Sequence, residues 1–312
     1  MSAHHLKLIA VGLAVVLLLW GGSALFSRGS DTVTGSLALP ALTAAQVDTI
    51  TVVKRADSIV LAKQSATAWS VNGHRAALDQ VTELLHALRD TIPPELVAED
   101  TSSFGRLNVD SAGGRWLGIR GDGKPLARLI VGARGSEYSS AYVRLPGDRH
   151  VYLWRGRLAQ LMDHGVDDWR DKKIAALDPD SIAALDVERG KDRYTLRRAG
   201  QGWTLNGAVA DSVAVRRYLE RLRTITALGF ATPAQLDSTR TARPTRRLVV
   251  RRAAGAAGAV LLSLTFDSTA TGVVVRHVAG VGGEAATAYR MNPWDVDGLT
   301  PTSQSLLPAK QK

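Results

Sequence analysis

The hydrophobic and polar positions along the chain predict two similar series of short elements. The segments Ala76–Asp90 and Asp211–Thr226 each carry apolar residues at spacings of three, one and three, which places them on one side of an amphipathic helix. These residues are Val81, Leu84, Leu85 and Leu88 in the first segment and Val215, Tyr218, Leu219 and Leu222 in the second. All four pairs have the same separation along the chain as Trp69 and Trp203.

Short, alternating runs rich in β-branched residues predict strands on both sides of each helix. Before the helices, Ile50–Lys54 with Ser58–Lys63, and Leu185–Arg189 with Arg193–Arg197, predict two hairpins. After the helices, four runs match in order: Trp116–Arg120 with Arg247–Arg251, Leu126–Gly132 with Val260–Phe266, Ala141–Arg144 with Val273–Arg276, and Val151–Trp154 with Ala288–Met291. Leu42–Val47 and Leu177–Ile182 predict short helices that lead into the hairpins, with Thr43 and Asp178 as N-caps.

A five-residue motif occurs once in each series, as WSVNG at Trp69–Gly73 and WTLNG at Trp203–Gly207. Asparagine and glycine both tolerate positive φ, so Asn-Gly predicts a tight turn between strands. The tryptophan of each motif is expected to fill the space between strand and helix. We therefore interpret six residues as structural anchors of a duplicated module: Trp69, Asn72, Gly73, Trp203, Asn206 and Gly207.

The uncharged apolar segment Leu8–Phe26 predicts a transmembrane helix of about 28 Å, close to the thickness of a bilayer core. A cleaved signal peptide remains the alternative, because Gly21–Ala24 consists of small residues. The predicted fold class is α+β: a transmembrane helix followed by two tandem repeats, each an antiparallel sheet with one amphipathic helix and short helices. The expected organisation is an anchor with a short cytoplasmic tail at 1–28, a linker at 29–39, repeats at 40–174 and 175–306, and a tail at 307–312.

Composition narrows the chemistry of the chain. It contains no cysteine, which excludes disulfides, thiolate metal sites and thiol nucleophiles. The histidines have no recognised metal-ligand spacing, and no Gly-x-Ser-x-Gly motif is present. Gly132–Ser140 is rich in glycine and serine, but it lies between predicted strands and is interpreted as a hairpin loop. The sequence therefore predicts no catalytic, cofactor or metal site, and a protein that is not an enzyme.

The chain is basic, with a net charge of +10 and a pI near 10.1. Arg243–Arg252 (RPTRRLVVRR) predicts a strand that carries arginine at the ends of both faces. A solvated strand is one interpretation. Contact with lipid phosphates or an anionic envelope polymer is the other, because guanidinium groups bind such oxyanions with two hydrogen bonds. The candidate contact residues are Arg243, Arg246, Arg247, Arg251 and Arg252; no motif indicates nucleic-acid binding.

The order of these motifs resembles a bacterial family named only as domain of unknown function 4340. The resemblance rests on W-x-[VL]-N-G, the amphipathic helix, LIVG, YVR, VYLW and DWRDKKI at Asp168–Ile174, and it extends over roughly residues 40–300. The second repeat departs from the pattern, because it lacks a clear RDKKI segment and contains a loose insertion at Ala253–Gly258. The resemblance implies no catalytic residues.

The same resemblance implies a place in the cell envelope. Members of this family are typically anchored at the N-terminus and face the periplasm, and several resemble auxiliary components of gliding-type ABC transport systems. We therefore expect a single-pass protein of the bacterial inner membrane, attached by residues 8–26, that contacts membrane subunits of an ABC-type transporter. The alternative is a binder of anionic envelope lipid or polymer that has no transporter partner.

Overall fold

The computed structural model describes residues 37, 39–40, 42–55, 57–89, 93–137, 139–241, 243–252, 259–284 and 287–308. The predicted membrane segment Leu8–Phe26 lies outside the described residues, and so does the insertion at residues 253–258. Among the described residues, no helix is both long enough and apolar enough to cross a membrane.

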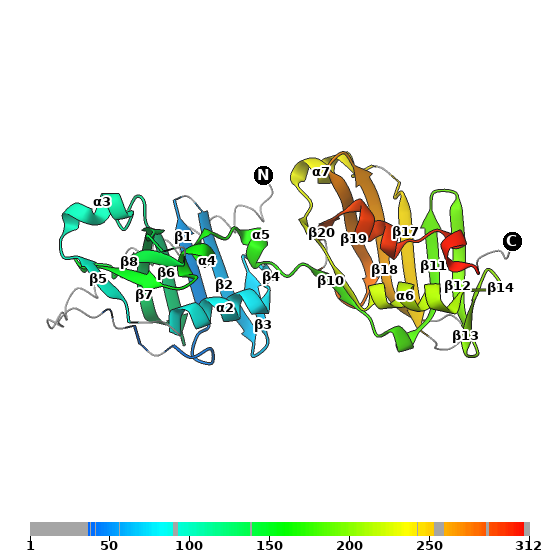
Figure 1. Ribbon diagram of the computed structural model, residues 1–312, viewed down its shortest axis with the longest axis horizontal. Helices are drawn as coiled ribbons and strands as arrows, with labels where there is room; N and C mark the ends of the chain where they lie inside the picture. The colour runs from blue at the N-terminus through cyan, green and yellow to red at the C-terminus, as the bar shows by residue number, and fades with distance from the viewer. Residues whose placement is uncertain are drawn as a thin grey trace. The chain divides into compact units, whose positions relative to one another are not determined.

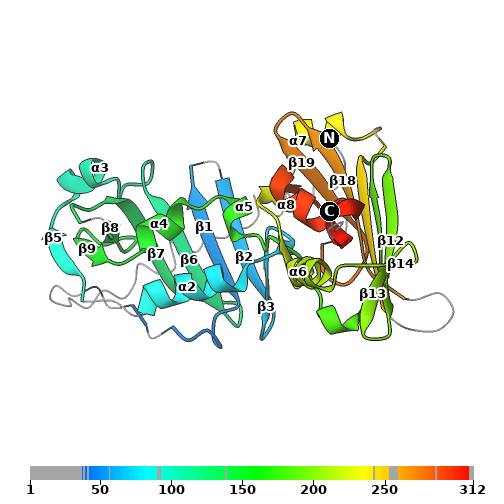
Figure 2. The same ribbon diagram turned by 45° about the vertical axis from the view of Figure 1, so that its right-hand side comes forward.

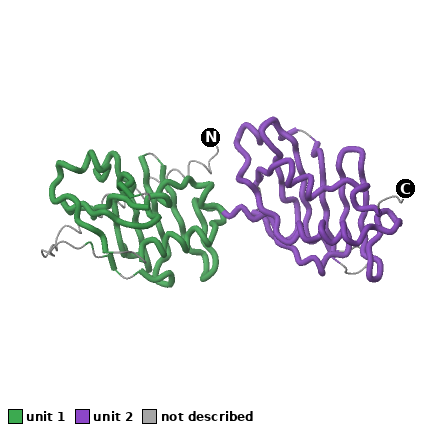
Figure 3. Tube along the Cα trace, in the orientation of Figure 1, with its two compact units in different colours: residues 1–170 green, residues 171–312 purple. Residues whose placement is uncertain are grey.

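The chain divides into two compact units, and the division lies between Arg170 and Asp171 (Figure 3). This is a few residues before the boundary at 174/175 that the motif alignment predicts. The difference arises because β10 (Lys173–Ala176) pairs with β15 (Thr224–Thr226) in a small two-stranded sheet of the second unit. The lysine-rich end of the DWRDKKI segment therefore belongs to the second unit.

The first unit contains a nine-stranded antiparallel sheet in its described part, with the strand order β4-β3-β2-β1-β6-β7-β8-β9-β5 (Figure 1). The strands are β1 (Thr49–Lys54), β2 (Asp57–Ser65), β3 (Ala68–Val71), β4 (His74–Arg75), β5 (Glu95–Ala98), β6 (Arg115–Gly121), β7 (Lys124–Arg134), β8 (Ser140–Arg144) and β9 (Val151–Arg155). The helices are α2 (Leu78–Arg89), the 3-10 turn η2 (Thr101–Ser103), α3 (Phe104–Leu107), α4 (Leu158–Asp163) and α5 (Val166–Trp169).

The second unit repeats this sheet in the residues that the structure describes there, with the order β14-β13-β12-β11-β17-β18-β19-β20-β16. Its strands are β11 (Ile182–Arg189), β12 (Asp192–Ala199), β13 (Gly202–Leu205), β14 (Ala208–Val209), β16 (Gly229–Phe230), β17 (Arg246–Arg252), β18 (Val260–Thr269), β19 (Gly272–Gly280) and β20 (Ala288–Met291). Its helices are η3 (Pro179–Ser181), α6 (Ser212–Leu222), α7 (Pro233–Ser238), α8 (Pro293–Leu299) and η4 (Ser303–Leu306). Strand by strand, the two orders correspond, as the motif alignment predicts.

Each sheet buries one face under its amphipathic helix. In the first unit, the apolar stripe of α2 packs with inward residues of β1, β2, β6, β7 and β8 in one core, which also contains the buried side of α4. In the second unit, α6 and α8 cover the corresponding face, as Figure 2 shows. The predicted stripe residues of both helices are all buried.

A short segment covers part of the other face of each sheet. In the first unit, Leu107 and Val109 at the end of α3 pack on Ile130 and Val151, which alternate with residues of the main core. In the second unit, α7 takes this place, because Arg276 of β19 donates to the Thr239 hydroxyl (2.7 Å) directly after α7. The first covering segment packs apolar side chains on the sheet in addition to its hydrogen bonds, whereas the contact that the second makes through Arg276 is polar.

Of three predicted helices, one is wrong, one is confirmed, and one ends earlier than expected. Leu42–Val47 contains a turn at residues 44–46 and no helix, and the Thr43 hydroxyl donates to Gln46 Oε1 (2.7 Å). The short helix predicted within Leu177–Ile182 is confirmed as the 3-10 helix η3, and so is its predicted cap, because Asp178 accepts from the Asp180 amide (3.1 Å). The helix predicted to reach Thr226 ends at Leu222, because the β-branched residues after it pair with β10.

Candidate functional site

The repeated Asn-Gly turns join strands in both units. Asn72 and Asn206 have φ values of 47° and 48°, in the left-handed region that asparagine tolerates. Asn72 Oδ1 accepts from the Val60 amide (2.8 Å), and Asn206 Oδ1 accepts from the Thr195 amide (2.9 Å). Each side chain thus fastens its turn to the neighbouring strand, which explains why the turn needs asparagine and assigns it a structural role.

The glycines and tryptophans of the motif also serve the fold. Gly73 and Gly207 have φ values of 85° and 89°, which a side chain disfavours. Trp69 is buried in the main core of the first unit. Trp203 is only partly buried, and the Arg198 guanidinium lies 5.3 Å from its ring centroid. None of these contacts indicates a ligand site.

The arginine strand β17 lies in the middle of the second sheet, and one of its arginines points toward the helices. Arg246 binds Asp297 of α8 (2.5 Å) and donates to the Thr300 hydroxyl (3.0 Å). Arg189 binds the same Asp297 oxygen (3.0 Å). Arg246 therefore holds α8 on the sheet, and an anionic surface does not reach a side chain that is only 19% exposed.

The other arginines of this segment lie in more accessible positions. Arg251 is bound to Asp186 of β11 (3.0 Å), so its charge is already paired. Arg243, Arg247 and Arg252 are exposed. Of the five arginines that the sequence indicates for contact with anions, these three are accessible to a partner.

Two arginines at matched positions, Arg144 (buried) and Arg276 (partly exposed), hold the covering segments. Arg144 of β8 stacks on the Phe104 ring (4.2 Å) and donates twice to the Val109 carbonyl (3.0 and 2.9 Å). Burial lowers the pKa of Arg144. Arg276 of β19, at the corresponding position, donates to Asp267 Oδ2 (2.5 Å). The last residue of the YVR and VVVR motifs is thus the anchor of a segment on the outer face of the sheet.

Asp267, the carboxylate that Arg276 binds, is buried. Its side chain is 4% exposed, and its other oxygen, Oδ1, has no hydrogen-bond partner among the described residues. Desolvation raises the pKa of Asp267, and the ion pair with Arg276 only partly opposes that rise. The charged form of this carboxylate is therefore unfavourable in the folded unit.

The raised pKa predicts how the Asp267→Asn variant responds to pH. A group whose pKa is raised by folding contributes its full stabilisation of the folded state below the pKa of the unfolded state, which is ordinarily 3.8 for aspartate. That contribution is lost as pH rises through the pKa of the folded state. We expect the free energy of unfolding of the wild type, relative to Asp267→Asn, to fall as pH rises from acid to neutral. Urea unfolding at several pH values measures this difference. The exposed variant Asp237→Asn is the control, and a difference independent of pH would contradict the prediction.

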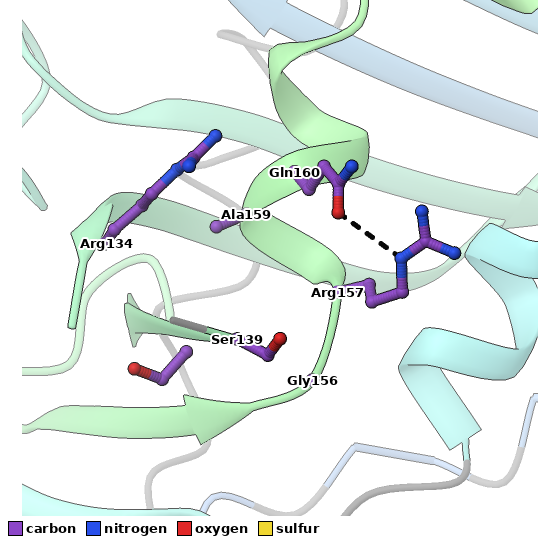
Figure 4. Close-up of a pocket in the computed structure, with 7 residues that line it drawn as sticks. Arg134, Ser139, Gly156, Arg157, Ala159 and Gln160 are labelled. Atoms are coloured by element: carbon purple, nitrogen blue, oxygen red, sulfur yellow. Dashed lines mark hydrogen bonds between the residues drawn. The ribbon is translucent and has the colours of Figure 1, made fainter. Parts of the chain in front are cut away.

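A small hollow lies beside α4 in the first unit, as Figure 4 shows. It has a volume of about 50 Å³ and is lined by Arg134, Ser139 and Arg157, among others. Arg134 is bound to Asp163 (3.2 Å), and Arg157 is bound to Glu83. Ligand pockets usually enclose roughly 300–1,000 Å³, so this hollow is too small for a substrate of ordinary size. The segment predicted as a hairpin loop, Gly132–Ser140, contains the end of β7 and the first residue of β8, so the connection between the two strands lies within it, as the sequence predicts.

Beside this hollow, Arg115 joins β6 to α4. Arg115 donates to Asp163, the Ala159 carbonyl (3.1 Å) and the Val131 carbonyl (3.3 Å). Its donors are therefore used by the fold, and Asp163 is held by two arginines. Within the described ranges, no group of three or more histidines and carboxylates is placed to hold a metal ion.

Sequence reasoning did not identify Trp294 as a candidate site residue. Trp294 in the first turn of α8 is 82% exposed, the largest exposed fraction among the large hydrophobic residues that the structure describes. The buried residues of α8 are Val296 and Leu299. At 100° per residue, Trp294 lies about 160° from Val296 and about 140° from Leu299, on the solvent side. The spacing of Trp294 from Val296 and Leu299 on a helix is the pattern in the sequence that indicates an exposed tryptophan.

The chain matches, over residues 39–244, a protein family described as a domain of unknown function (DUF4340). The match covers the described first unit from residue 39 and continues into the second unit, and it ends before β17. The arginine strand therefore lies outside the matched region, which is shorter than the 40–300 expected from the motifs. No curated protein and no solved structure matches this chain.

Proposed function

This chain belongs to the family of the domain of unknown function DUF4340, and from that premise we propose that it is a non-catalytic accessory protein of the bacterial cell envelope. In this proposal residues 8–26 anchor it in the inner membrane and both units lie on the periplasmic side. There the units contact the membrane subunits of an ABC-type transporter.

The observation that carries the proposal is a difference between the outer faces of two matching sheets. In the first sheet, Val53 of β1 pairs with Trp116 of β6 on the face away from α2. At the matching place in the second sheet, Glu188 of β11 pairs with Arg247 of β17. The same scaffold thus presents an apolar pair in one unit and a charged pair in the other.

Two different surfaces on one chain suit an adaptor that holds two partners, or two parts of one partner. Linked modules bind a common partner at a raised effective concentration, so each contact need only be weak. Apolar and aromatic residues supply contact area, whereas charged pairs favour one orientation over others. This arrangement supports a role in assembly more than a role in chemistry.

The test is co-purification of the full-length chain, tagged after Lys312, from crosslinked and gently solubilised membranes. We expect transporter membrane subunits in stoichiometric amounts. Val53→Lys and Arg247→Glu, one on each outer face, are expected to reduce the recovery several-fold, because each removes one of two linked contacts. The matched control is Arg216→Glu, an exposed arginine of α6 on the helix side of the second unit.

Recovery of the protein alone would overturn the transporter proposal. It would leave the alternative role, binding of anionic lipid or envelope polymer by Arg243, Arg247 and Arg252, which are accessible in the structure. Binding of that kind weakens steeply with added salt.

A further inference from the structure

The exposed indole of Trp294 lies at the start of a small patch on the helix side of the second unit. Tryptophan carries a large apolar surface, and its exposure to water is unfavourable unless a partner covers it. Trp294 and Gly298 are four residues apart and so lie on the same side of α8. Gly298 is in contact with the next helix: a Cβ there would lie 2.4 Å from the Arg221 guanidinium.

That next helix supplies positive charge to the same face of the second unit. Figure 2 shows α6 and α8 on the same face of the second sheet. Arg217 and Arg221 are four residues apart on α6, so they form a row along one side of it. Both are exposed, and neither forms an ion pair within the part of the chain that the structure describes. The row therefore carries two available guanidinium groups.

Two of the three acidic groups of α6 and α8 are bound to arginines. Glu220 is bound to Arg223 (2.9 Å), and that contact lowers the pKa of Glu220. Asp297 is bound to Arg189 and Arg246. Asp295 accepts from the Asn292 amide group (3.5 Å). Arg217 and Arg221, which form no ion pair, outnumber Asp295, the one carboxylate of the two helices without an arginine partner among the described residues. The net charge of this face is therefore positive and complementary to an anionic partner.

We propose that this patch, formed by Trp294, Arg217 and Arg221, binds the headgroup layer of an anionic phospholipid membrane. Indole rings prefer the interface between headgroups and acyl chains, where the ring is dry and its N–H is hydrated. Guanidinium groups beside it bind lipid phosphates with two hydrogen bonds. An indole that is 82% exposed on α8 fits a soft headgroup layer better than a rigid partner, which would need a matching pocket. The proposal is independent of the outer-face contacts and of β17.

The test uses brominated phospholipids, which quench the fluorescence of a tryptophan that enters the interface. The full-length chain and its Trp294→Phe variant are bound to nanodiscs of anionic or zwitterionic lipid, with and without bromine. The difference between the two proteins isolates Trp294, because the other tryptophans contribute equally to both. We expect the emission of Trp294 to shift to the blue and to be quenched by brominated anionic lipid, and to be little changed by the zwitterionic lipid.

Charge reversal separates this patch from the rest of the basic surface. The double variant Arg217→Glu, Arg221→Glu is expected to lose the quenching of Trp294, whereas Arg252→Glu on β17 retains it. Emission of Trp294 that stays unquenched in both lipids would overturn the proposal. So would protection of Trp294 only when another protein is added, which would indicate a protein partner. Failure of this proposal can be told apart from failure of the proposed function. If only this proposal fails, Trp294→Phe still recovers the transporter subunits, because the outer-face contacts do not involve Trp294.

Discussion

Replacement of Phe266 by alanine is expected to lower the free energy of unfolding of the second unit by about 3–5 kcal/mol. Phe266 is fully buried in β18, within the core that α6 and α8 close. Truncation removes the apolar contacts of the ring and leaves a cavity that a close-packed core fills only in part. Hydrogen exchange of amides in residues 171–308 measures the loss of protection.

Trp169→Ala is the matched variant of the first unit. Trp169 is also fully buried, and its carbonyl accepts from the Ala77 amide (2.8 Å) just before α2. Because the two units have separate cores, each variant is expected to reduce protection mainly in its own unit. Equal loss of protection in both units from either variant would contradict this expectation.

The duplication could be predicted from sequence because it rests on local patterns. The apolar stripes of α2 and α6 fix one face of each helix, and alternation fixes one face of each strand. Asn-Gly places a tight turn at a defined residue in both copies. These local signals have the same order in the two halves, and the two sheets have the same strand order.

The ends of the helices could not be predicted in this way. A short helix is costly to begin, so Leu42–Val47 gains more from the turn that joins Thr43 and Gln46 than from a helical turn. Thr224–Thr226 continues the helical pattern but pairs with β10, far away in sequence. Pairing of distant segments overrides a weak local preference.

The candidate site shows the same limit. Sequence reasoning indicates a basic strand, and the strand forms at Arg246–Arg252. It does not reveal that Asp297 and Asp186 pair with two of its arginines, because these carboxylates lie far from β17 along the chain. The solvent position of Trp294, in contrast, follows from its spacing to Val296 and Leu299.

Arg144→Ala is expected to lower the free energy of unfolding of the first unit by about 2–4 kcal/mol. The substitution removes the stacking on Phe104 and leaves the Val109 and Asp148 carbonyls without their donor. These carbonyls belong to the segments that Arg144 ties to the sheet. Chemical unfolding gives the total loss, and hydrogen exchange of residues 99–112 shows where protection is lost first.

Arg144→Lys separates charge from shape. Lysine keeps a positive charge but has neither the planar group that stacks on Phe104 nor the two donors that reach the Val109 carbonyl. We therefore expect Arg144→Lys to lose most of the stability that Arg144→Ala loses. If lysine restored wild-type stability, charge alone would hold the covering segment, and the role of the arginine as an anchor by hydrogen bonding would be wrong.

The equivalent test at Arg276 differs, because its removal leaves Asp267 buried without a cation. The expected result is a still higher pKa of the Asp267 carboxyl.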